Sequence, residues 1–414
     1  MFFNRLNRRC ILNVFLVVCV SVMISGCSRL YRSSAADAKA GWPEFSWDTV
    51  PVCLHFGKTI SPLTEEELEF VANNCDFVCL EKGHGQYLLG STEKGIAHDA
   101  KRLKALNPKI KVLFYWNTFL NYPLYDACRE VEKHPDWLLR DKDGNVLYKL
   151  IADTPGYSVT DTGPANIEQY NLLNPDFRKW WASIAGKAIS RYHCDGIFMD
   201  AVDQAKRPLL MEQAWGKGNE ALLTAAVIDM MQLAKKAMGN RSILLYNHIH
   251  TSDNTGQTSS MQYLPYADGG MIEHFTAFNS RTKETIATDI DNILKISEAG
   301  CFPAVKGWPD PTFNWLDTEK MKLPPEQLAE EAREKITFSL ACFLAAAQEH
   351  SYFCYSWGYR ERHGNLVDYP EFHKPLGPPK GPADRNGWIY TREFEHASVW
   401  VDIENRTAKI DWHK

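Results

Sequence analysis

The 414-residue sequence lacks an excess of charge of either sign. It has 46 Lys and Arg residues against 51 Asp and Glu residues, for a formal net charge of −5. No basic stripe is present that could neutralise phosphates, which argues against a nucleic-acid-binding protein. A hydrophobic content of 45% is typical of a folded chain with one large domain, or with one domain and a small appendage.

The sequence also lacks a cysteine pattern that predicts a metal site. Cys75 and Cys79 have a suggestive spacing, but no second Cys or His pair accompanies them. We therefore expect neither a metal nor another cofactor. Five of the eight cysteines after Cys27 lie in or beside apolar, strand-like runs, which predicts buried free thiols rather than a disulfide framework: Cys53, Cys79, Cys194, Cys301 and Cys354.

The apolar run near the N-terminus, residues 11–24, is too short to span a membrane comfortably. A positive segment precedes it, and Ile24-Ser25-Gly26-Cys27 follows it and resembles the bacterial lipobox. Residues 1–27 are therefore predicted to be a lipoprotein signal peptide with Cys27 as the lipidated residue, and an uncleaved anchor is the alternative. Residues 28–41 are predicted to be a flexible tether. We expect a periplasmic or cell-surface protein that a lipid anchor holds to the membrane.

No glycine-rich phosphate loop follows the first expected strand, which disfavours an open doubly wound sheet. Instead, short apolar runs alternate with helical stretches. Seven of the eight expected strands lie at 52–57, 76–80, 110–116, 241–246, 269–272, 301–305 and 352–355, and the fourth in chain order is the run that ends at residue 200. Eight such units predict a (β/α)₈ TIM barrel over residues 42–367, with its active site at the carboxyl ends of the strands.

Two regions depart from this alternation. Residues 118–173 are a long insertion with a hairpin turn predicted at 141–145, and loops of this length in a compact domain are usually functional. Residues 368–414 begin with five prolines that exclude a long helix. Two strands are then expected, at 388–394 and 398–403, as a short β-hairpin that packs on the barrel.

The fourth apolar run ends abruptly in Asp200. A carboxylate beside Ile197, Phe198 and Met199 costs free energy unless it is paired or used in chemistry. We predict that Asp200 is catalytic, and a structural cap for the next turn is the alternative.

A second acid, Glu273, follows the sixth run. Glycoside hydrolysis needs two carboxyl groups, one to protonate the leaving oxygen and one to attack the anomeric carbon or activate water. We predict Asp200 as the nucleophile and Glu273 as the proton donor, with His274 and Phe275 raising its pKa. A salt bridge from Glu273 to Lys306 is the alternative, and Glu81 and Asp203 are weaker catalytic candidates.

The other expected strand ends carry side chains suited to sugars, because aromatic faces pack on the apolar faces of sugar rings and polar groups bond hydroxyls. The predicted substrate-binding residues are Glu81, Lys82, Trp116, Asn117, Asn247, His248, Lys306, Trp308 and Trp357. Trp315 is a further expected platform, and His55, Lys58 and Tyr359 complete the predicted rim. Each tryptophan could equally fill the core.

Three other functions fit parts of this rim. His84, His248 and His274 could converge on a metal, although no HxH or HxxxE spacing supports it. Lys306 could form a Schiff base, as in barrel lyases and aldolases. A barrel that binds glycans without cleaving them is the third.

Five stretches have a familiar order along the chain: Asn174-Pro175-Asp176-Phe-Arg178-Lys-Trp180, Gly-Ile-Phe-Met-Asp200, Lys374-Pro-Leu-Gly377, Tyr390-Thr-Arg-Glu-Phe394 and Val399-Trp-Val401. Across most of residues 42–410, the chain resembles a family of bacterial TIM-barrel glycoside hydrolases whose substrates are unassigned.

In related retaining α-glycosidases, a nucleophilic Asp closes the fourth strand and an acid/base carboxylate closes the sixth. The resemblance therefore implies these roles for Asp200 and Glu273. The large β-glycosidase clan has Glu after strands four and seven, where this chain has Asp200 and Lys306. The resemblance thus implies an oligo- or polysaccharide substrate, α-linked, in an envelope or extracellular glycan. No signal for an oligomeric state is present.

Overall fold

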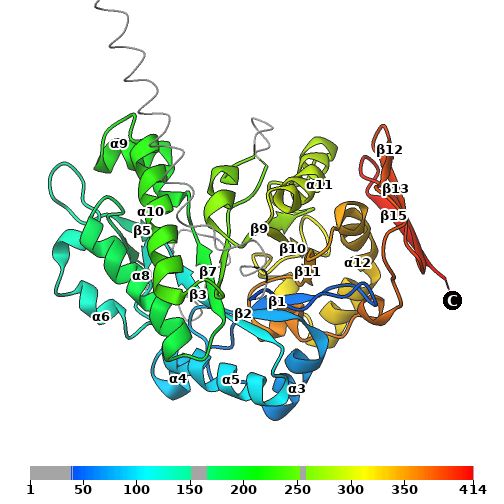
Figure 1. Ribbon diagram of the computed structural model, residues 1–414, viewed down its shortest axis with the longest axis horizontal. Helices are drawn as coiled ribbons and strands as arrows, with labels where there is room; N and C mark the ends of the chain where they lie inside the picture. The colour runs from blue at the N-terminus through cyan, green and yellow to red at the C-terminus, as the bar shows by residue number, and fades with distance from the viewer. Residues whose placement is uncertain (1–38, 40, 151–165, 252–257, 414) are drawn as a thin grey trace, which may run out of the picture.

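Eight parallel strands form the central sheet of the computed structural model, which describes residue 39 and residues 41–150, 166–251 and 258–413 (Figure 1). The predicted signal peptide, Cys27 and nearly all of the predicted tether lie outside these residues. In sheet order, which is also chain order, the strands are β1 (Cys53–Phe56), β2 (Phe77–Leu80), β3 (Lys111–Asn117), β7 (Gly196–Asp200), β8 (Ile243–Tyr246), β9 (Gly269–Phe275), β10 (Phe302–Gly307) and β11 (Tyr352–Tyr355).

The sheet closes on itself between its first and last strands. Parallel bridges join Val52 to Phe353 and Gly57 to Arg360, and the Phe353 amide donates to the Pro51 carbonyl at 2.9 Å. A closed ring of eight parallel strands is a TIM barrel, so the predicted fold class is confirmed and the open doubly wound sheet is excluded.

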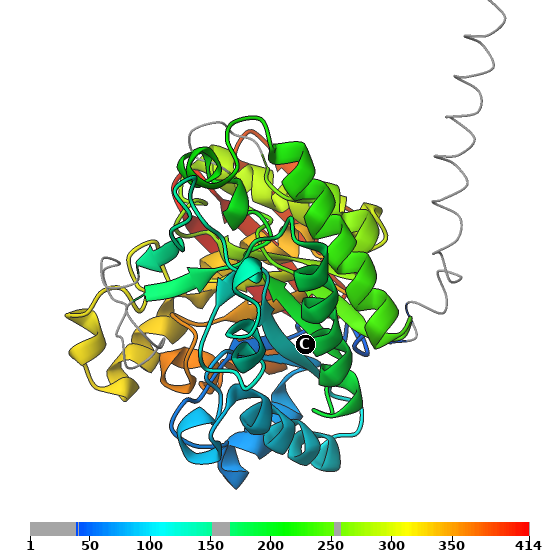
Figure 2. The ribbon, with the colours of Figure 1, turned by 90° about the vertical axis from the view of Figure 1, so that its left-hand side faces the viewer.

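Six long helices lie around the barrel in the part of the chain that the structure describes: α3 (Glu65–Asn74), α5 (Thr92–Leu106), α8 (Pro175–Ser190), α10 (Glu220–Met238), α11 (Lys283–Glu298) and α12 (Pro325–Ala346). A capping box starts α3, where the Thr64 side chain accepts from the Glu67 amide and the Glu67 side chain accepts from the Thr64 amide. The Asn174 side chain caps α8 by accepting from the amides of Asp176 and Phe177, with Pro175 at the first helical position. Helices α8 and α10 pack side by side (Figure 2).

Two of the eight expected helices are replaced by shorter elements in the described residues. Between β8 and β9 lies the 3₁₀ helix η3 (Met261–Tyr266), which contains Pro265 and so lacks one backbone donor. After β11 the chain forms only the short η5 (Glu361–Asn365) and η6 (Pro370–His373). The expectation of eight complete strand–helix units is therefore wrong in these two units.

The insertion after β3 folds into a small antiparallel sheet in the order β4 (Leu120–Asn121), β6 (Asn166–Gln169) and β5 (Tyr148–Leu150), with α6 (Cys128–Val131) and η1 (Pro135–Trp137) beside it. The predicted hairpin turn is present, because the Asp141 carboxylate accepts from the amides of Asp143 and Asn145. This sheet brings Lys149 of β5 to the carboxyl ends of the barrel strands, near Asp200.

The C-terminal segment is larger than the expected hairpin. It is a four-stranded antiparallel sheet of β12 (Asp384–Asn386), β13 (Ile389–Glu393), β14 (Ala397–Asp402) and β15 (Thr407–Trp412). It lies against α12 at the edge of the barrel (Figure 1). The Arg392 guanidinium ties the two together by donating to the carbonyls of Leu344 and Ala347 at 2.9 and 2.7 Å.

Rings of inward side chains fill the barrel below its carboxyl end. The His55 and Phe198 rings lie 4.7 Å apart, and Tyr115 lies 5.9 Å from Phe198. Gly196 lets β7 and β8 approach, since a Cβ there would lie 2.0 Å from the Ile243 carbonyl oxygen. This packed floor leaves the strand ends as the place where a substrate can enter.

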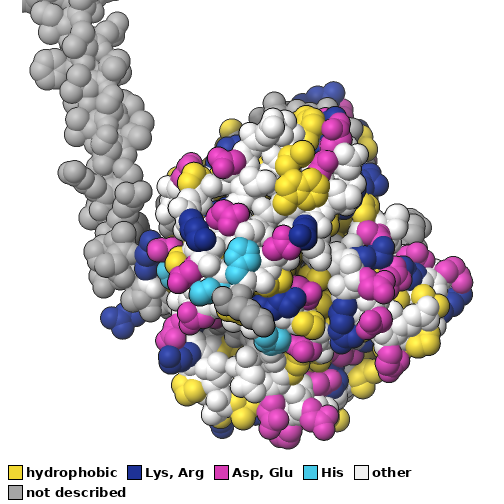
Figure 3. All heavy atoms as spheres, turned by 90° about the vertical axis from the view of Figure 1, so that its right-hand side faces the viewer, with side chains coloured by type: hydrophobic (Ala, Val, Ile, Leu, Met, Phe, Trp, Pro, Cys, Tyr) yellow, Lys and Arg dark blue, Asp and Glu magenta, His cyan; other side chains and the backbone are white. Residues whose placement is uncertain are grey.

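The cysteines behave as the sequence predicts. All eight that the structure describes, the five named above among them, are buried and free. Within the described ranges, none of the helices is long and apolar enough to cross a membrane. On the face drawn in Figure 3, acidic and basic side chains are interspersed, with no stripe of one sign.

Candidate active site

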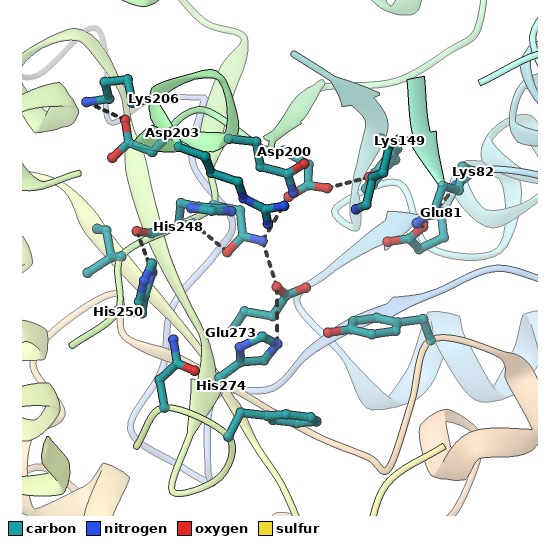
Figure 4. Close-up of a pocket in the computed structure, with 18 of the residues that line it drawn as sticks. Glu81, Lys82, Lys149, Asp200, Asp203, Lys206, His248, His250, Glu273 and His274 are labelled. Carbon is teal, nitrogen blue, oxygen red and sulfur yellow. Dashed lines mark hydrogen bonds and ion pairs between the residues drawn. The ribbon is translucent and has the colours of Figure 1, made fainter. Parts of the chain in front are cut away.

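A cavity of about 760 Å³ lies at the carboxyl ends of the strands. Side chains from five strand ends line it, together with residues from the insertion and from the loops after β7, β9 and β10 (Figure 4). The central lining residues are Glu81, Tyr115, Asp200, Asn247, Glu273 and Tyr359. The structure thus brings Asp200 and Glu273 into one cavity.

One amide group joins these two carboxyl groups. Asn247 Nδ2 donates to Asp200 Oδ1 at 3.0 Å and to Glu273 Oε2 at 2.8 Å. Because both oxygens bond to one nitrogen, they lie no more than 5.8 Å apart, which is the sum of the two distances. The Asn247 amide is itself oriented, since its Oδ1 accepts from the His248 amide at 2.7 Å. His248 has a φ of 86°, a left-handed conformation that is costly for this residue.

Hydrogen-bond donors surround the Asp200 carboxylate. Besides Asn247, the Tyr115 hydroxyl donates to Oδ2 at 2.5 Å and Asn117 Nδ2 donates to the same oxygen at 3.2 Å. These bonds fix the positions of both carboxylate oxygens of Asp200. In the described residues, these side-chain donors come from β3 and from the end of β8, and the next turn supplies none. The structure therefore does not support the alternative that Asp200 is a helix or turn cap.

Glu273 is in a different environment. Its side chain is 18% exposed, and burial, followed by the negative charge of Asp200, raises the pKa of its carboxyl group. The rise in the pKa of Glu273 is as predicted, but the neighbouring charges that act on it do not include His274. Burial lowers the pKa of His274 to about 3, so its ring is neutral, 3.7 Å from Glu273 Oε2. Glu273 therefore holds a proton more readily than an ordinary glutamate does.

Lys306 lies below the cavity rather than in it. Its side chain is 0% exposed, and its ammonium donates to Ser356 and, at 3.2 Å, to the Gly358 carbonyl. The predicted roles of Lys306 in substrate binding and in a Schiff base are therefore wrong, because a substrate carbonyl cannot reach it. The ion pairs of the described residues include none between Lys306 and Glu273.

Three predicted tryptophan platforms also point elsewhere. Successive side chains of a strand face opposite sides, so Trp116, between the inward Tyr115 and Asn117, points outward. Its Nε1 donates to the Trp181 carbonyl of α8 at 3.2 Å. Trp308 and Trp357 are each 1% exposed, and neither lines the cavity.

Each of these two buried rings has a packing role instead. Trp308 Nε1 donates to the Glu273 carbonyl at 2.9 Å, and so supports the strand end that carries this acid. The Trp357 ring packs 5.4 Å from Phe313. Trp315 does line the cavity, as expected, and the other aromatic lining comes from Tyr115, Tyr122, Phe278 and Tyr359.

Glu81 and Lys82 line the cavity as a closed ion pair. Glu81 bonds to Lys82 Nζ at 2.7 Å and to His55 Nε2 at 2.8 Å. Burial would raise the pKa of Glu81, but the charge of Lys82 and the His55 contact outweigh it and lower the pKa to about 2. Glu81 is therefore ionised at neutral pH and is unsuited to donate a proton.

Some of the remaining predicted rim residues line the cavity, and others lie outside it. Asn247 and His248 line the cavity, whereas Asn117 lies behind Asp200 and Lys58 pairs with Glu67 at 2.6 Å. Asp203 lines the cavity in an ion pair with Lys206 at 2.6 Å, and it also accepts from Tyr263 at 2.9 Å.

The three histidines do not converge. His84 is 0% exposed and bonds to Asp99 at 2.8 Å, outside the cavity that His248 and His274 line. Among the residues that the structure places, no group of three or more His, Cys, Asp or Glu side chains is arranged to hold a metal ion.

Several cavity residues were not expected from the sequence. Tyr115 could have been found, because it lies two residues before Asn117 on the same face of β3. The others come from irregular loops and from the insertion, whose arrangement no local pattern predicts: Tyr122, Lys149, Gln204, Lys206, Arg207, His250, Phe278 and Asn279.

A family model described as hypothetical glycosyl hydrolase family 15 matches residues 104–398, more than half of the chain. No curated protein sequence matches.

Three solved structures are similar in fold. The α-galactosidase TtGalA from Thermus thermophilus, in complex with p-nitrophenyl α-D-galactopyranoside, is 15% identical over 90% of this chain and 70% of its own, with a TM-score of 0.47. The glycoside hydrolase domain of PelA from Pseudomonas aeruginosa is 14% identical over 75% and 95%, with a TM-score of 0.43. The maltogenic α-amylase AmyB from Thermotoga neapolitana is 13% identical over 84% of each chain, with a TM-score of 0.46.

Proposed function

The chain belongs to the hypothetical glycosyl hydrolase family 15, and we propose that it cleaves an α-linked sugar from a glycan with retention of anomeric configuration. Asp200 is the nucleophile and Glu273 is the acid/base in this proposal. The observation that carries it is the Asn247 amide, which holds the two carboxyl groups side by side on the cavity floor.

The first step uses the different environments of the two acids. Glu273 donates its proton to the glycosidic oxygen while Asp200 attacks the anomeric carbon, so that the C–O bond to the leaving group breaks and a glycosyl ester forms. The raised pKa of Glu273 keeps the proton available. Tyr115 and Asn117 hold Oδ2 of Asp200 in place.

The second step reverses the role of Glu273. Once Asp200 is esterified its negative charge is gone, and that charge is one of the causes of the raised Glu273 pKa. The pKa of Glu273 therefore falls in the intermediate, and its carboxylate can take a proton from water. This water attacks the anomeric carbon and releases Asp200. The same two groups thus serve both steps.

The separation of the carboxyl groups supports retention. Retaining enzymes place the two groups about 5–5.5 Å apart, whereas inverting enzymes leave about 6.5–9.5 Å for a bound water. Asp200 Oδ1 and Glu273 Oε2 lie no more than 5.8 Å apart, and the Asn247 amide occupies the space between them, so this close approach favours the retaining arrangement. The α-linkage is supported by the positions of the acids at the ends of the fourth and sixth barrel strands, the arrangement of the α-glycosidases that this chain resembles.

The test is hydrolysis of a panel of 4-nitrophenyl α- and β-glycosides, with the first-formed anomer identified by proton NMR. We expect an α-glycoside to be cleaved and the α-anomer to form first. Asp200→Asn should lose activity by several orders of magnitude and still bind the product sugar. Asp203→Asn is the matched control, because Asp203 lines the same cavity but is already paired with Lys206, and its loss of activity should be far smaller.

Undiminished hydrolysis by Asp200→Asn would refute the proposal. A protein that binds glycans and cleaves no member of the panel would instead be the non-catalytic barrel. First formation of the β-anomer from an α-glycoside would mean inversion.

We also propose that the enzyme acts on an envelope or extracellular glycan while a lipid on Cys27 holds it to the membrane. The support is the lipobox-like Ile24-Ser25-Gly26-Cys27 after a short apolar run. Metabolic labelling with a fatty acid should mark the full chain and not its Cys27→Ala variant. Equal labelling of both would exclude the anchor.

A further inference from the structure

The charged side chains of the cavity do not all have partners. Glu81 pairs with Lys82, and Asp203 pairs with Lys206. Two basic side chains of the lining, Lys149 and Arg207, remain. The ion pairs and side-chain hydrogen bonds of the described residues include none for either of them. The charge of Asp200 acts on Lys149, and the exposed Glu220 also lines the cavity, but neither is bonded to Lys149 or Arg207. The cavity therefore contains two cations whose hydrogen-bonding groups are open to a ligand.

Lys149 reaches the cavity from above. It belongs to β5, which pairs with β6 in the sheet of the insertion, and its side chain points into the cavity beside Asp200 (Figure 4). Burial, followed by the positive charge of Arg207, lowers its pKa to about 8; Lys82 acts in the same direction, and the negative charge of Asp200 opposes them. An ammonium group that is partly removed from water, beside other cations and without a bonded anion, is costly. Such a cost is typical of a site whose counter-charge arrives with a ligand.

We propose that Lys149 and Arg207 form an anion-binding subsite, and that the sugar attacked by Asp200 carries a carboxylate or a sulfate group. This inference rests on the proposed glycosidase function. It adds the class of substrate: an acidic sugar, such as a uronic acid or a sulfated hexose, in place of a neutral one.

The chemistry of the two side chains suits this class. A guanidinium presents two parallel N–H donors that match a carboxylate or a sulfate, and an ammonium adds a point charge with three donors. An acidic sugar beside Asp200 would be repelled by its carboxylate, and Lys149 lies where it offsets that repulsion. The same cations repel a protonated amino sugar, so the subsite also selects against that class.

The experiment compares 4-nitrophenyl α-glycosides of one hexose in four forms: neutral, 6-carboxylate, 6-O-sulfate and 2-amino. We expect kcat/KM of the wild type to be about tenfold to a hundredfold higher for an anionic form than for the neutral form, mainly through KM, as a hydrogen-bonded charge predicts. Whichever of the 6-carboxylate and 6-O-sulfate forms has the higher kcat/KM shows whether the subsite prefers a carboxylate or a sulfate.

Lys149→Met keeps most of the side-chain length and removes the charge. We expect it to lower the anionic-to-neutral ratio of kcat/KM about tenfold or more. Lys142→Met is the matched control, because Lys142 is an exposed lysine in the turn of the same insertion, and it should keep the wild-type ratio. A ratio that is unchanged in Lys149→Met, or a wild-type preference for the neutral or amino form, would overturn the inference.

A measurement on the wild type alone covers the case in which Lys149→Met does not fold. Raising the salt concentration should raise KM for the anionic form and leave KM for the neutral form unchanged, because only the former depends on charge attraction. Equal salt dependence would contradict the subsite. The two proposals fail on different results. If cleavage depends on Asp200 but shows no preference for the anionic forms, only the anion-binding subsite is refuted. If none of the four forms is cleaved in an Asp200-dependent way, the glycosidase mechanism itself is refuted.

Discussion

The Tyr115 hydroxyl donates a 2.5 Å hydrogen bond to Oδ2 of Asp200, while Asn247 binds the other oxygen, Oδ1, at 3.0 Å. Burial, followed by the charge of Asp200, raises the pKa of Tyr115 well above its usual value. The phenol therefore stays protonated and acts as a permanent donor. Both oxygens of the proposed nucleophile are thus fixed by neutral groups from neighbouring strands, which leaves its negative charge available for attack.

Removal of the Tyr115 hydroxyl tests this fixation. Tyr115→Phe keeps the ring that packs on Phe198. It deletes the donor to Asp200 and the acceptor for Asn117 Nδ2. A hydrogen bond to a charged group is worth about 1.5–3 kcal/mol. We therefore expect a lower melting temperature and, because the nucleophile loses its alignment, a fall in kcat of about tenfold to a hundredfold. Steady-state kinetics and a thermal melt measure the two effects. Unchanged kcat would show that the bond does not support the reaction.

Asn247→Ala should change the pH profile as well as the rate. The Asn247 hydrogen bond lowers the pKa of Glu273, against the larger effects of burial and Asp200. Without it the pKa of Glu273 rises further, so the alkaline limb of the kcat/KM profile should move to higher pH. Asn279→Ala is a suitable control, since Asn279 lines the cavity but is not among the donors to either acid. An alkaline limb that stays in place would contradict the assigned bridge.

Glu273 itself should set the alkaline limb of activity. Its pKa is raised, so protonated enzyme persists above the usual range of a glutamate, and kcat/KM should fall as the pH rises through that pKa. Glu273→Gln should be slow on substrates with poor leaving groups. It should be much less impaired on dinitrophenyl glycosides, which need little protonation, and the alkaline limb should disappear. An identical loss on both kinds of substrate would argue against a proton-donor role.

The Glu81 ion pair predicts a stability effect in acid. The pKa of Glu81 is about 2 in the folded protein against a usual 4.5. Its contribution is therefore complete above about pH 4.5 and is lost as the pH falls towards 2, with an upper limit of about 3 kcal/mol. Glu81→Gln should lower the urea midpoint markedly at pH 6 and much less at pH 3. The exposed Glu132→Gln serves as the control, and an equal loss for Glu81→Gln at both pH values would contradict the ion-pair account.

Much of the fold could be predicted because barrel strands are continuous apolar runs. Residues such as Ile197, Phe198 and Met199 are buried on both faces of β7, so burial itself marks the strand, and the polar residue that follows marks its end. Asp200 and Glu273 were found in this way. Position at a strand end does not determine which face a side chain occupies: Trp116 alternates with the inward Tyr115 and therefore points away from the cavity.

The rest depends on contacts between distant segments. Lys149 and Arg207 come from the insertion and from the loop after β7, and only the folded chain brings them to Asp200. Lys306 stands at a strand end in the sequence, yet Ser356 and the Gly358 carbonyl hold it below the cavity floor. The residues of β15 alternate between half-buried and exposed where the strand packs against α12. Because none of them is fully buried, the sequence beyond residue 403 does not predict this strand.

The central claim is that Asp200 forms the covalent bond to the sugar. The most direct measurement is mass spectrometry of peptides from enzyme inactivated with a 5-fluoro-α-glycosyl fluoride of the sugar that the wild type cleaves best. We predict one added glycosyl unit on the peptide that contains residues 196–203, located at Asp200 by fragmentation and absent from Asp200→Asn. An adduct on Glu81 or Asp203, or active enzyme that forms no adduct while it inverts its substrate, would contradict the account.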